Sequence, residues 1–271
     1  MKKTDIYKMV KENPTMLYNP MPDYIKEKFP VITMDILDKM GFHFTTKHNG
    51  KMSGMYSLST SCKCNTHCKQ RIEQAYKLLG IEIGNKESIK KYLKENPLAE
   101  NISICAFCFS DSQQDYMTSM ITPLARNHEI LKNGIIHSDW IPIINALYFR
   151  IESFGDFDNM NQVINVYNIC KKNPLVHFTG WTKNLVYFYK ADKQGIEKPS
   201  NFKLVYSSQF INKVANVPES CKHLVNLVFT VYTKEYRDLH NIKINCGANA
   251  CLTCLRCYTG GNIHYINELL K

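Results

Sequence analysis

Cysteine is the residue type in this chain of 271 residues whose number and spacing most clearly predict chemistry. Eleven cysteines are present, and nine of them fall into three groups. The groups are Cys62, Cys64 and Cys68; Cys105 and Cys108; and Cys246, Cys251, Cys254 and Cys257. Because charged residues interrupt the first residues before any apolar run develops, we expect a cytoplasmic protein without a secretory signal, in which thiols stay reduced. Clustered thiols there favour metal binding or catalysis over a disulfide framework.

The densest group lies near the C-terminus. Cys251, Cys254 and Cys257 follow one another at three-residue steps, with Cys246 five residues upstream. Three thiolates at this spacing can surround an iron–sulfur cubane, whereas structural zinc sites more often use two separated Cys-x2-Cys pairs. We therefore expect a [4Fe-4S] cluster here, with zinc, or free or disulfide-linked thiols, as the alternatives. A closed four-cysteine site could also serve only to hold the C-terminal segment in place, whatever its metal.

The second candidate metal site combines Cys105 and Cys108 with the upstream group. Three of these five thiols could hold a cluster and leave one iron open for a ligand. The Cys64-x3-Cys68 spacing matches the start of the Cys-x3-Cys-x2-Cys triplet of radical S-adenosylmethionine enzymes, but Arg71 stands where the third cysteine would fall. Cys62, Cys64 and Cys68 therefore all remain candidates for the third ligand.

The elements that would position these residues alternate between strands and helices. We expect strands at 102–109, 146–151, 176–179, 202–206, 224–231 and 243–245. We expect helices at 69–79, 87–95, 116–131, 160–170, 184–192, 235–240 and 262–270, and a further amphipathic candidate at 35–40. Repeated βα units imply parallel strands joined by right-handed crossovers. The α/β fold is then either an open doubly wound sheet or a partial or complete βα barrel, and we prefer the barrel.

Three segments are expected along the chain. Residues 1–60 form an N-terminal cap or extension, residues 61–241 the barrel-like core, and residues 242–271 a Cys-rich, metal-binding C-terminal segment. In the core, the carboxyl ends of the strands should meet at one edge, where parallel α/β folds carry their functional residues. The residues expected at this edge are Cys108, Glu152, Asp156, Trp181, Lys183, Ser207, Ser208 and Cys246.

Two carboxylates and one lysine at this edge are candidates for catalysis. Glu152 and Asp156 could hold a substrate amine or act as acid and base, or they could cap the following helix. Lys183 could hold an anion at the same edge, although lysine is also common on protein surfaces.

Five motifs then occur in a fixed order over residues 59–258. They are Thr60-Ser61-Cys62, Cys105-x2-Cys108-Phe109, Phe149-Arg150-Ile151-Glu152-Ser153-Phe154-Gly155-Asp156-Phe157, Phe178-Thr179-Gly180-Trp181-Thr182-Lys183-Asn184 and Cys246-x4-Cys251-x2-Cys254-x2-Cys257-Tyr258. Together they resemble the phage "gene product eighty-eight" family, which is similar to radical S-adenosylmethionine proteins. Two positions depart from the family pattern, since Phe109 stands in place of a tyrosine and Phe154 in place of a serine.

The resemblance implies that Cys105, Cys108 and one upstream cysteine hold a [4Fe-4S] cluster. It places the loop from Glu152 to Asp156 where related enzymes hold the methionine amino group of S-adenosylmethionine. The cofactor-binding residues that it implies are Glu152, Ser153, Gly155 and Thr179. About forty residues separate Cys62 from Cys105, which is more than the family usually has, so the connecting loop is enlarged.

The leading hypothesis is therefore an iron–sulfur protein of phage or mobile-element origin. It would be a radical S-adenosylmethionine-like enzyme with a second cluster that tunes or relays electrons, and its partners would be an electron donor and a substrate that the motifs do not name. An alternative of another class is a zinc-stapled, Lys-rich module that contacts nucleic acid or a host protein without catalysis. A third is a barrel enzyme whose clusters are purely structural.

Charge and motif content weigh against several other classes. The net charge of +10 would suggest nucleic acid or a membrane surface as a partner, but only five of the 34 basic residues are the arginines that grip phosphates and guanine best. No apolar run approaches the ~18 residues of a membrane span, so no membrane partner is expected. The chain lacks His-x3-His, Gly-x-Gly-x-x-Gly and the phosphate-binding Gly-x4-Gly-Lys motif, so zinc hydrolases and common nucleotide-binding enzymes have no support.

Overall fold

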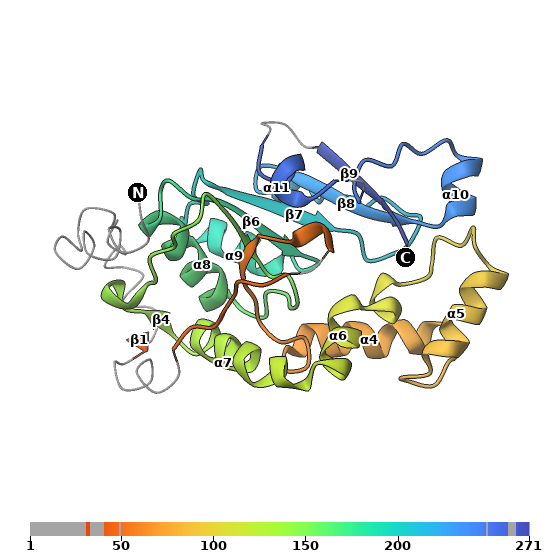
Figure 1. Cartoon of the computed structure of the whole chain (residues 1–271), viewed down its shortest axis with the longest axis horizontal. Coiled ribbons are helices and arrows are strands. Elements are labelled where there is room, and N and C mark those ends of the chain that lie inside the picture. The colour runs from red at the N-terminus through yellow and green to blue at the C-terminus, as the bar shows by residue number, and fades with distance from the viewer. Residues whose placement is uncertain (1–30, 33–40, 49, 248, 260–263, 271) are drawn as a thin grey trace.

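A seven-stranded sheet forms the centre of the molecule (Figure 1). The computed structural model describes residues 31–32, 41–48, 50–247, 249–259 and 264–270, so the expected helix at 35–40 lies outside the described residues. The strand order is β2-β3-β5-β6-β7-β8-β9. The strands are β2 (Phe44–Thr45), β3 (Tyr56–Leu58), β5 (Tyr148–Ile151), β6 (His177–Thr182), β7 (Phe202–Ser207), β8 (Leu227–Tyr232) and β9 (His264–Leu269).

The sheet is open. Only β2 runs antiparallel to its neighbour, and from β3 to β9 every adjacent pair is parallel and follows the order of the chain. β2 and β9 lie at opposite ends of that order, so the prediction of a complete barrel is wrong, whereas the α/β class with parallel strands is confirmed. The sheet takes strands from each of the three segments expected from the sequence. A separate parallel pair joins β1 (Val31–Ile32) to β4 (Ile135–Ile136).

Helices α8 (Met160–Lys172) and α9 (Val186–Lys193) cover one face of the sheet (Figure 1). Alternate strand residues point to this face, as the pleat requires. The aromatic side chains of Phe149, Phe178 and Phe202 are buried there. The Tyr167 ring of α8 meets Phe202 edge-on at 5.6 Å between ring centroids. This face is therefore the main hydrophobic core, and α7 (Ile121–Lys132) extends it beside α8.

The opposite face of the sheet is covered by the C-terminal segment. Short helix α11 (Cys251–Cys254) lies on that side of the strands in Figure 1. The Thr179 hydroxyl donates a hydrogen bond to the Cys257 carbonyl at 3.1 Å, and the rings of Tyr148 and Tyr258 meet at 5.3 Å. The cysteine-rich segment is thus packed against β5 and β6.

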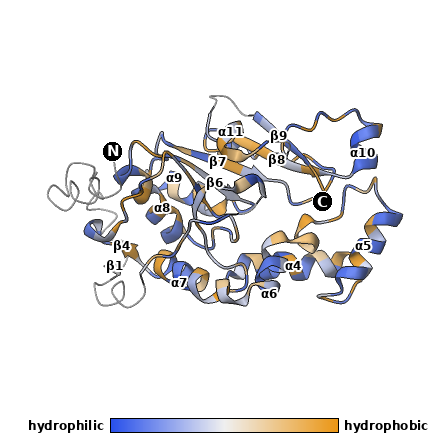
Figure 2. Cartoon of the chain, in the orientation of Figure 1, coloured by the Kyte–Doolittle hydropathy of each residue, from blue (hydrophilic) through white to orange (hydrophobic). Residues whose placement is uncertain are grey.

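A helical lobe lies beside the sheet (Figure 1). It consists of α4 (Thr66–Leu78), α5 (Lys86–Glu95), the 3-10 turn η2 (Ile104–Phe107) and α6 (Phe109–Tyr116). Its small core contains Ala75, Tyr76, Ile89 and Ala106. In Figure 2, α5 is largely hydrophilic on the side away from this core. Helix α10 (Lys234–Leu239), which follows β8 in the chain, is also largely hydrophilic.

The expected strand at 102–109 is wrong. Within it only Ser103 makes a β-bridge, to Phe210, and the chain then forms η2 and enters α6. The Ser103 hydroxyl accepts a hydrogen bond from the Cys105 amide at 3.3 Å, which starts the turn, and the apolar residues after it pack on α4 and α5 instead of entering a sheet. The apolar run had indicated burial correctly but not the kind of element.

The C-terminal elements also differ from expectation. The predicted helix at 262–270 is instead strand β9, and the predicted strand at 243–245 is not one. Ile266 is buried in one cluster with Val205 and Leu227, and the Asn245 amide donates to the Asn267 carbonyl at 3.1 Å. The pairing of β9 with β8 therefore determines the secondary structure of this region. The periodicity of apolar residues does not reveal such a long-range pairing.

The other expected elements are confirmed to within a few residues, except that the helix expected at 116–131 is split. It is interrupted after Tyr116 by the 3-10 turn η3 (Thr118–Met120) before α7 begins. The remaining 3-10 turns are η1 (Gly50–Met52), η4 (Ser138–Trp140) and η5 (Glu219–Cys221). Among the described residues, no helix combines the length and the hydrophobicity that crossing a membrane requires.

Candidate functional site

Lys183 joins the carboxyl ends of three neighbouring strands. Strands β5, β6 and β7 end at Ile151, Thr182 and Ser207. The Lys183 amide donates to Asp156 Oδ2 at 2.8 Å, and its Nζ donates to Ser207 Oγ at 2.9 Å. The expected convergence of these side chains at one edge is therefore present in the structure. Ser208 turns away, since its hydroxyl donates to the carbonyls of Phe210 and Lys213.

The Cys105-x2-Cys108 pair lies close to this edge. The positive charge of Lys183 acts to lower the pKa of both thiols, although burial dominates at Cys105 and raises its pKa. At Cys108 the hydrogen bond from the Cys62 thiol is the largest effect and lowers the pKa to about 7, against the opposing effect of burial. Cys108 is thus prepared to be a thiolate, which is the form that binds metals.

Cys62 is fixed by a buried hydrogen-bond chain. The Ser61 hydroxyl donates to Gln114 Oε1 at 2.5 Å, and Gln114 Nε2 donates to Cys62 Sγ at 3.1 Å. Both Ser61 and Gln114 are fully buried. Because α6 carries Gln114 and begins directly after Cys108, this chain fixes Cys62 relative to the Cys105-x2-Cys108 turn.

Cys68 lies in the first turn of α4. Burial, followed by the negative charges of Asp156 and Cys108, raises its pKa well above the usual value. The Cys62 thiol is hydrogen-bonded to Cys108, and the choice of the third ligand among Cys62, Cys64 and Cys68 stays a prediction.

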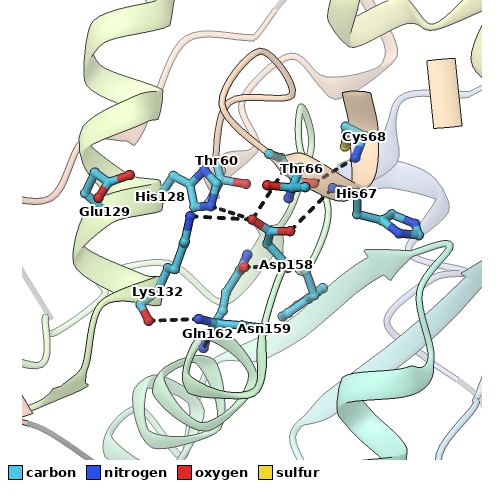
Figure 3. A network of polar contacts seen from close by, with 12 residues as sticks. Thr60, Thr66, His67, Cys68, His128, Glu129, Lys132, Asp158, Asn159 and Gln162 are labelled. Carbon is cyan, nitrogen blue, oxygen red and sulfur yellow. Dashed lines mark hydrogen bonds and ion pairs between the residues drawn. The ribbon is translucent and has the colours of Figure 1, made fainter. Parts of the chain in front are cut away.

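A buried contact between His128 and Asp158 anchors the start of α4 (Figure 3). Asp158 accepts hydrogen bonds from the amides of Thr66 and His67, and His128 Nε2 lies 3.1 Å from Asp158 Oδ2. Burial alone would raise the pKa of Asp158, but the hydrogen bond and charge of His128 and the two amides lower it. Lys132 Nζ lies 3.8 Å from Asp158 Oδ2 and adds a positive charge. A carboxylate at a helix N-terminus is favourable, so this contact holds Cys68 in place.

Glu152 is buried and fully engaged. Its backbone has a φ of 57°, and its Oε2 accepts from the amide and the hydroxyl of Thr60, each at 3.0 Å. Gln162 Nε2 donates to Oε1 at 2.7 Å. Burial raises the pKa of Glu152 to about 8 despite these hydrogen bonds. The carboxyl therefore ties the end of β3 to α8 through the loop that follows β5.

Asp156 closes the same loop. Its Oδ1 accepts from the Thr182 hydroxyl at 2.6 Å and from the Phe157 amide at 2.7 Å. With the Lys183 amide on the other oxygen, it links the loop to the end of β6. The structure shows the hydrogen bonds of Glu152, Asp156 and Lys183. Their roles as acid, base or substrate contact stay predictions.

The other implied cofactor residues lie in two places. Ser153 and Gly155 belong to the same loop, where the Ser153 hydroxyl is buried and has no hydrogen-bond partner among the described residues. Thr179 instead contacts the C-terminal segment through the Cys257 carbonyl. The structure therefore brings Ser153 and Gly155, but not Thr179, to the edge where Cys105 and Cys108 lie.

We expect Gly155→Ala to lower the free energy of unfolding by about 1–3 kcal/mol. A Cβ at this position would lie 2.2 Å from Thr60 Oγ1 and 2.8 Å from the Thr60 carbonyl. Urea denaturation followed by circular dichroism measures the loss. Ser153→Ala in the same loop is the control, and equal stability of Gly155→Ala and wild type would show that the loop has room to shift.

Glu152 predicts a pH dependence of stability. Its folded pKa of about 8 lies above the model-peptide value of 4.5, so between these values the folded state holds a proton that the unfolded state has lost. Stability should therefore fall by about 1.4 kcal/mol per pH unit as the pH rises from about 5 to 8. Glu152→Gln should remove this slope in urea denaturation series, whereas the exposed Glu235→Gln should retain it; equal slopes in all three proteins would contradict the shift.

The C-terminal cysteines line one pocket on the opposite face of the sheet. Cys246, Cys251, Cys254 and Cys257 share it with Lys51, Arg150 and Trp181. Burial raises the pKa of Cys257 to about 11, and the other three thiols add to the rise. Lys51 Nζ lies 3.5 Å from Cys246 Sγ and forms an ion pair with Glu268 at 2.6 Å.

Arg150 and Trp181 form the floor of this pocket. The guanidinium carbon lies 4.2 Å from the centroid of the indole ring. Arg150 Nε and Trp181 Nε1 are both buried and have no hydrogen-bond partner among the described residues. Buried donors without partners are costly, so a ligand with acceptor or thiolate character would satisfy them. Cys246 was expected at a strand end, but this is wrong because residues 243–245 do not form a strand.

A model of the gene product 88 family matches residues 38–264, which is most of the chain. The chain belongs to the gene product 88 family. The phage gene-product resemblance is thereby confirmed, while the likeness to radical S-adenosylmethionine proteins stays a prediction. No curated protein and no solved structure gave a significant match.

Several residues of this gene product 88 family member were not predicted from the sequence. Gln114, Thr60 and Gln162 hold the site residues, and the His128–Asp158 pair anchors α4. The sequence offered one signal for them, namely side-chain amides on apolar helix faces, because buried amides require hydrogen-bond partners. Over the described residues, no group of three or more His, Cys, Asp or Glu side chains has the arrangement that holds a single metal ion.

Proposed function

We propose that this gene product 88 family member is an iron–sulfur protein whose first cluster is held by Cys62, Cys105 and Cys108. The observation that carries the proposal is the contact between Cys62 and Cys108 beside Lys183. Two thiols from segments far apart in the chain meet there, at the edge of a parallel sheet where α/β proteins place their functional groups.

The residues present fit a cluster. The donors are all sulfur, which suits an iron–sulfur cluster; Cys62 is buried, and Cys105 and Cys108 are half-buried. Lys183 supplies a positive charge close to the thiolates, and Gln114 donates a hydrogen bond to the Cys62 sulfur. Both contacts favour thiolates, and such contacts around the ligands also set the reduction potential of a cluster.

A [4Fe-4S] cluster bound there would supply one-electron chemistry and, with three thiolates, one iron for a further ligand. The chain's own groups would place that ligand. Lys183 offers a cation from the end of β6, and Ser153 offers a buried hydroxyl with no hydrogen-bond partner among the described residues. Amino-carboxylate contacts of this kind suit S-adenosylmethionine, so we propose a radical S-adenosylmethionine-like enzyme within a partial βα barrel.

We further propose that the four C-terminal cysteines hold a second cluster. The pocket they line contains Arg150 and Lys51, whose charges oppose the net negative charge of a four-thiolate centre. Trp181 of β6 lines this pocket, and Lys183, directly after the end of β6, belongs to the first site.

Anaerobic purification followed by iron and sulfide analysis, with and without S-adenosylmethionine, tests the proposal. Visible charge-transfer absorbance and a reduced-state electron paramagnetic resonance signal that S-adenosylmethionine perturbs are expected. Zinc in place of iron, together with steeply salt-dependent binding to DNA or RNA, would instead identify the zinc-stapled basic module.

Arg150→Gln tests the C-terminal site separately. Removing the cation should lower the reduction potential of the second cluster, because a positive charge stabilises the more negative reduced form. Redox titration monitored by electron paramagnetic resonance measures the shift. Arg256→Gln is the matched control, since that side chain lies at the pocket but donates to the Asn245 carbonyl at 2.8 Å. An unchanged potential in Arg150→Gln would contradict the assignment.

A further inference from the structure

Arg71 of α4 is a half-buried cation that the proposed function does not use. Its Nη1 donates to Gln209 Oε1 at 2.9 Å and to Gln74 Oε1 at 3.4 Å. No carboxylate of a described residue forms an ion pair with it, and its remaining guanidinium N–H groups make no hydrogen bond to a described residue. A cation that is partly withdrawn from water favours an anion beside it.

The ring of His67 lies on the same face of α4. His67 stands four residues before Arg71, and side chains at this spacing are neighbours on a helix. Asp158 accepts a hydrogen bond from the His67 amide, while the ring points away from Asp158 (Figure 3). Its Nε2 is buried and has no hydrogen-bond partner among the described residues. Because buried polar groups nearly always have partners, this nitrogen indicates a ligand beside Arg71.

Gln209 connects this face of α4 to the first site. It lies two residues after the end of β7, and its carbonyl accepts from the Ile104 amide at 2.9 Å, directly before Cys105. Its side-chain Nε2 makes no hydrogen bond to another described residue. Gln209 therefore holds Arg71 beside the turn that contains Cys105, and it adds a third donor that is available to a ligand.

Two cations and two carboxylates act on the His67 ring. Arg71 and Lys183 act to lower its pKa, and Asp156 and Asp158 act to raise it. Both carboxylates already accept hydrogen bonds from the chain, whereas neither cation forms an ion pair with a carboxylate among the described residues. The groups that remain available at this place are therefore donors, which suits an oxyanion.

We propose that His67, Arg71 and Gln209 bind a phosphate group of the substrate. This inference rests on the proposed function, to which it adds the substrate class, a phosphate monoester. Guanidinium groups bind phosphate oxygens strongly. Donors from three side chains meet at one place, which suits the three free oxygens of a single phosphate group, whereas a nucleic-acid backbone requires a row of cations. The phosphate would hold the substrate beside the Cys105 turn.

Titration of inorganic phosphate into the full-length protein at constant ionic strength, followed by phosphorus nuclear magnetic resonance, tests this inference. Arg71→Gln should raise the dissociation constant about tenfold or more, because a hydrogen bond to a charged group is lost. His67→Ala should weaken binding in the same direction. Arg256→Gln is the matched control, since it removes the same charge from the pocket on the opposite face of the sheet and should leave the constant unchanged.

His67→Ala keeps the test decisive if circular dichroism shows that Arg71→Gln does not fold. Asp158 contacts the backbone amide of residue 67 and not the ring, so this variant retains the anchor of α4. Equal dissociation constants for wild type, His67→Ala and a folded Arg71→Gln would overturn the phosphate site, as would no phosphate binding by wild type. Either result would leave the iron–sulfur assignment intact.

Further arms of the titration test the substrate class. Tighter binding of acetate than of phosphate would overturn the choice of a phosphate group. Arg71-dependent binding of a single-stranded oligonucleotide without a terminal phosphate would overturn the monoester in favour of nucleic acid. Arg71-dependent phosphate binding by a chain that holds no iron after reconstitution would support the phosphate site and overturn the proposed function alone.

Discussion

Replacing Cys108 with serine should remove about half of the iron bound by the anaerobically purified protein, because one of two four-iron centres is lost. Cys108 accepts the hydrogen bond from Cys62 and has its pKa lowered to about 7, so it is the thiol best prepared to bind iron. Cys257→Ser should remove the other half, since Cys257 belongs to the separate pocket on the opposite face of the sheet. Iron and sulfide analysis of the two variants measures both effects.

The control for these variants is Cys221→Ala. Cys221 is buried in the main core, away from both cysteine groups, so its replacement should leave the iron content unchanged. Loss of all the iron from either Cys108→Ser or Cys257→Ser would mean that the chain has one centre and not two. Full retention in Cys108→Ser would remove Cys108 from the ligand set.

Asp158→Ala should lower the free energy of unfolding by about 2–4 kcal/mol. Asp158 and His128 are both buried, and the amides of Thr66 and His67 would also lose their acceptor (Figure 3). Urea denaturation measures the loss.

An exposed pair of the same kind provides the control. His137 and Asp139 lie 3.6 Å apart, with 53% and 68% of their side chains exposed. Solvent-exposed ion pairs contribute little, so Asp139→Ala should change stability by less than about 0.5 kcal/mol. If both aspartate variants lost the same stability, the anchor at Asp158 would not be what holds α4.

Most elements of the fold were predictable from local patterns. Helix α8 and strands β5 to β8 follow from the spacing of their apolar residues, because both sides of this layer are buried. The exceptions depended on contacts distant in sequence. Residues 102–109 are apolar because they pack on α4 and α5, and β9 is a strand because it pairs with β8.

The candidate site was predictable in its residue types but not in its partners. Parallel strand ends must meet at one edge, so the convergence of Asp156, Lys183 and Ser207 followed from topology. The choice among Cys62, Cys64 and Cys68 did not, because it depends on how α4 enters the site through Asn65 and Asp158. Likewise the buried contacts of Glu152 with Thr60 and Gln162 join residues from three separate segments.

The central claim is that soft sulfur ligands in this gene product 88 family member hold iron and sulfide. Quantification of iron, acid-labile sulfide and zinc in the anaerobically isolated full-length protein tests it most directly. We expect about eight iron atoms and about eight sulfides per chain after reconstitution, four of each for every centre. Zinc with neither iron nor sulfide, or no bound metal at all, would contradict it.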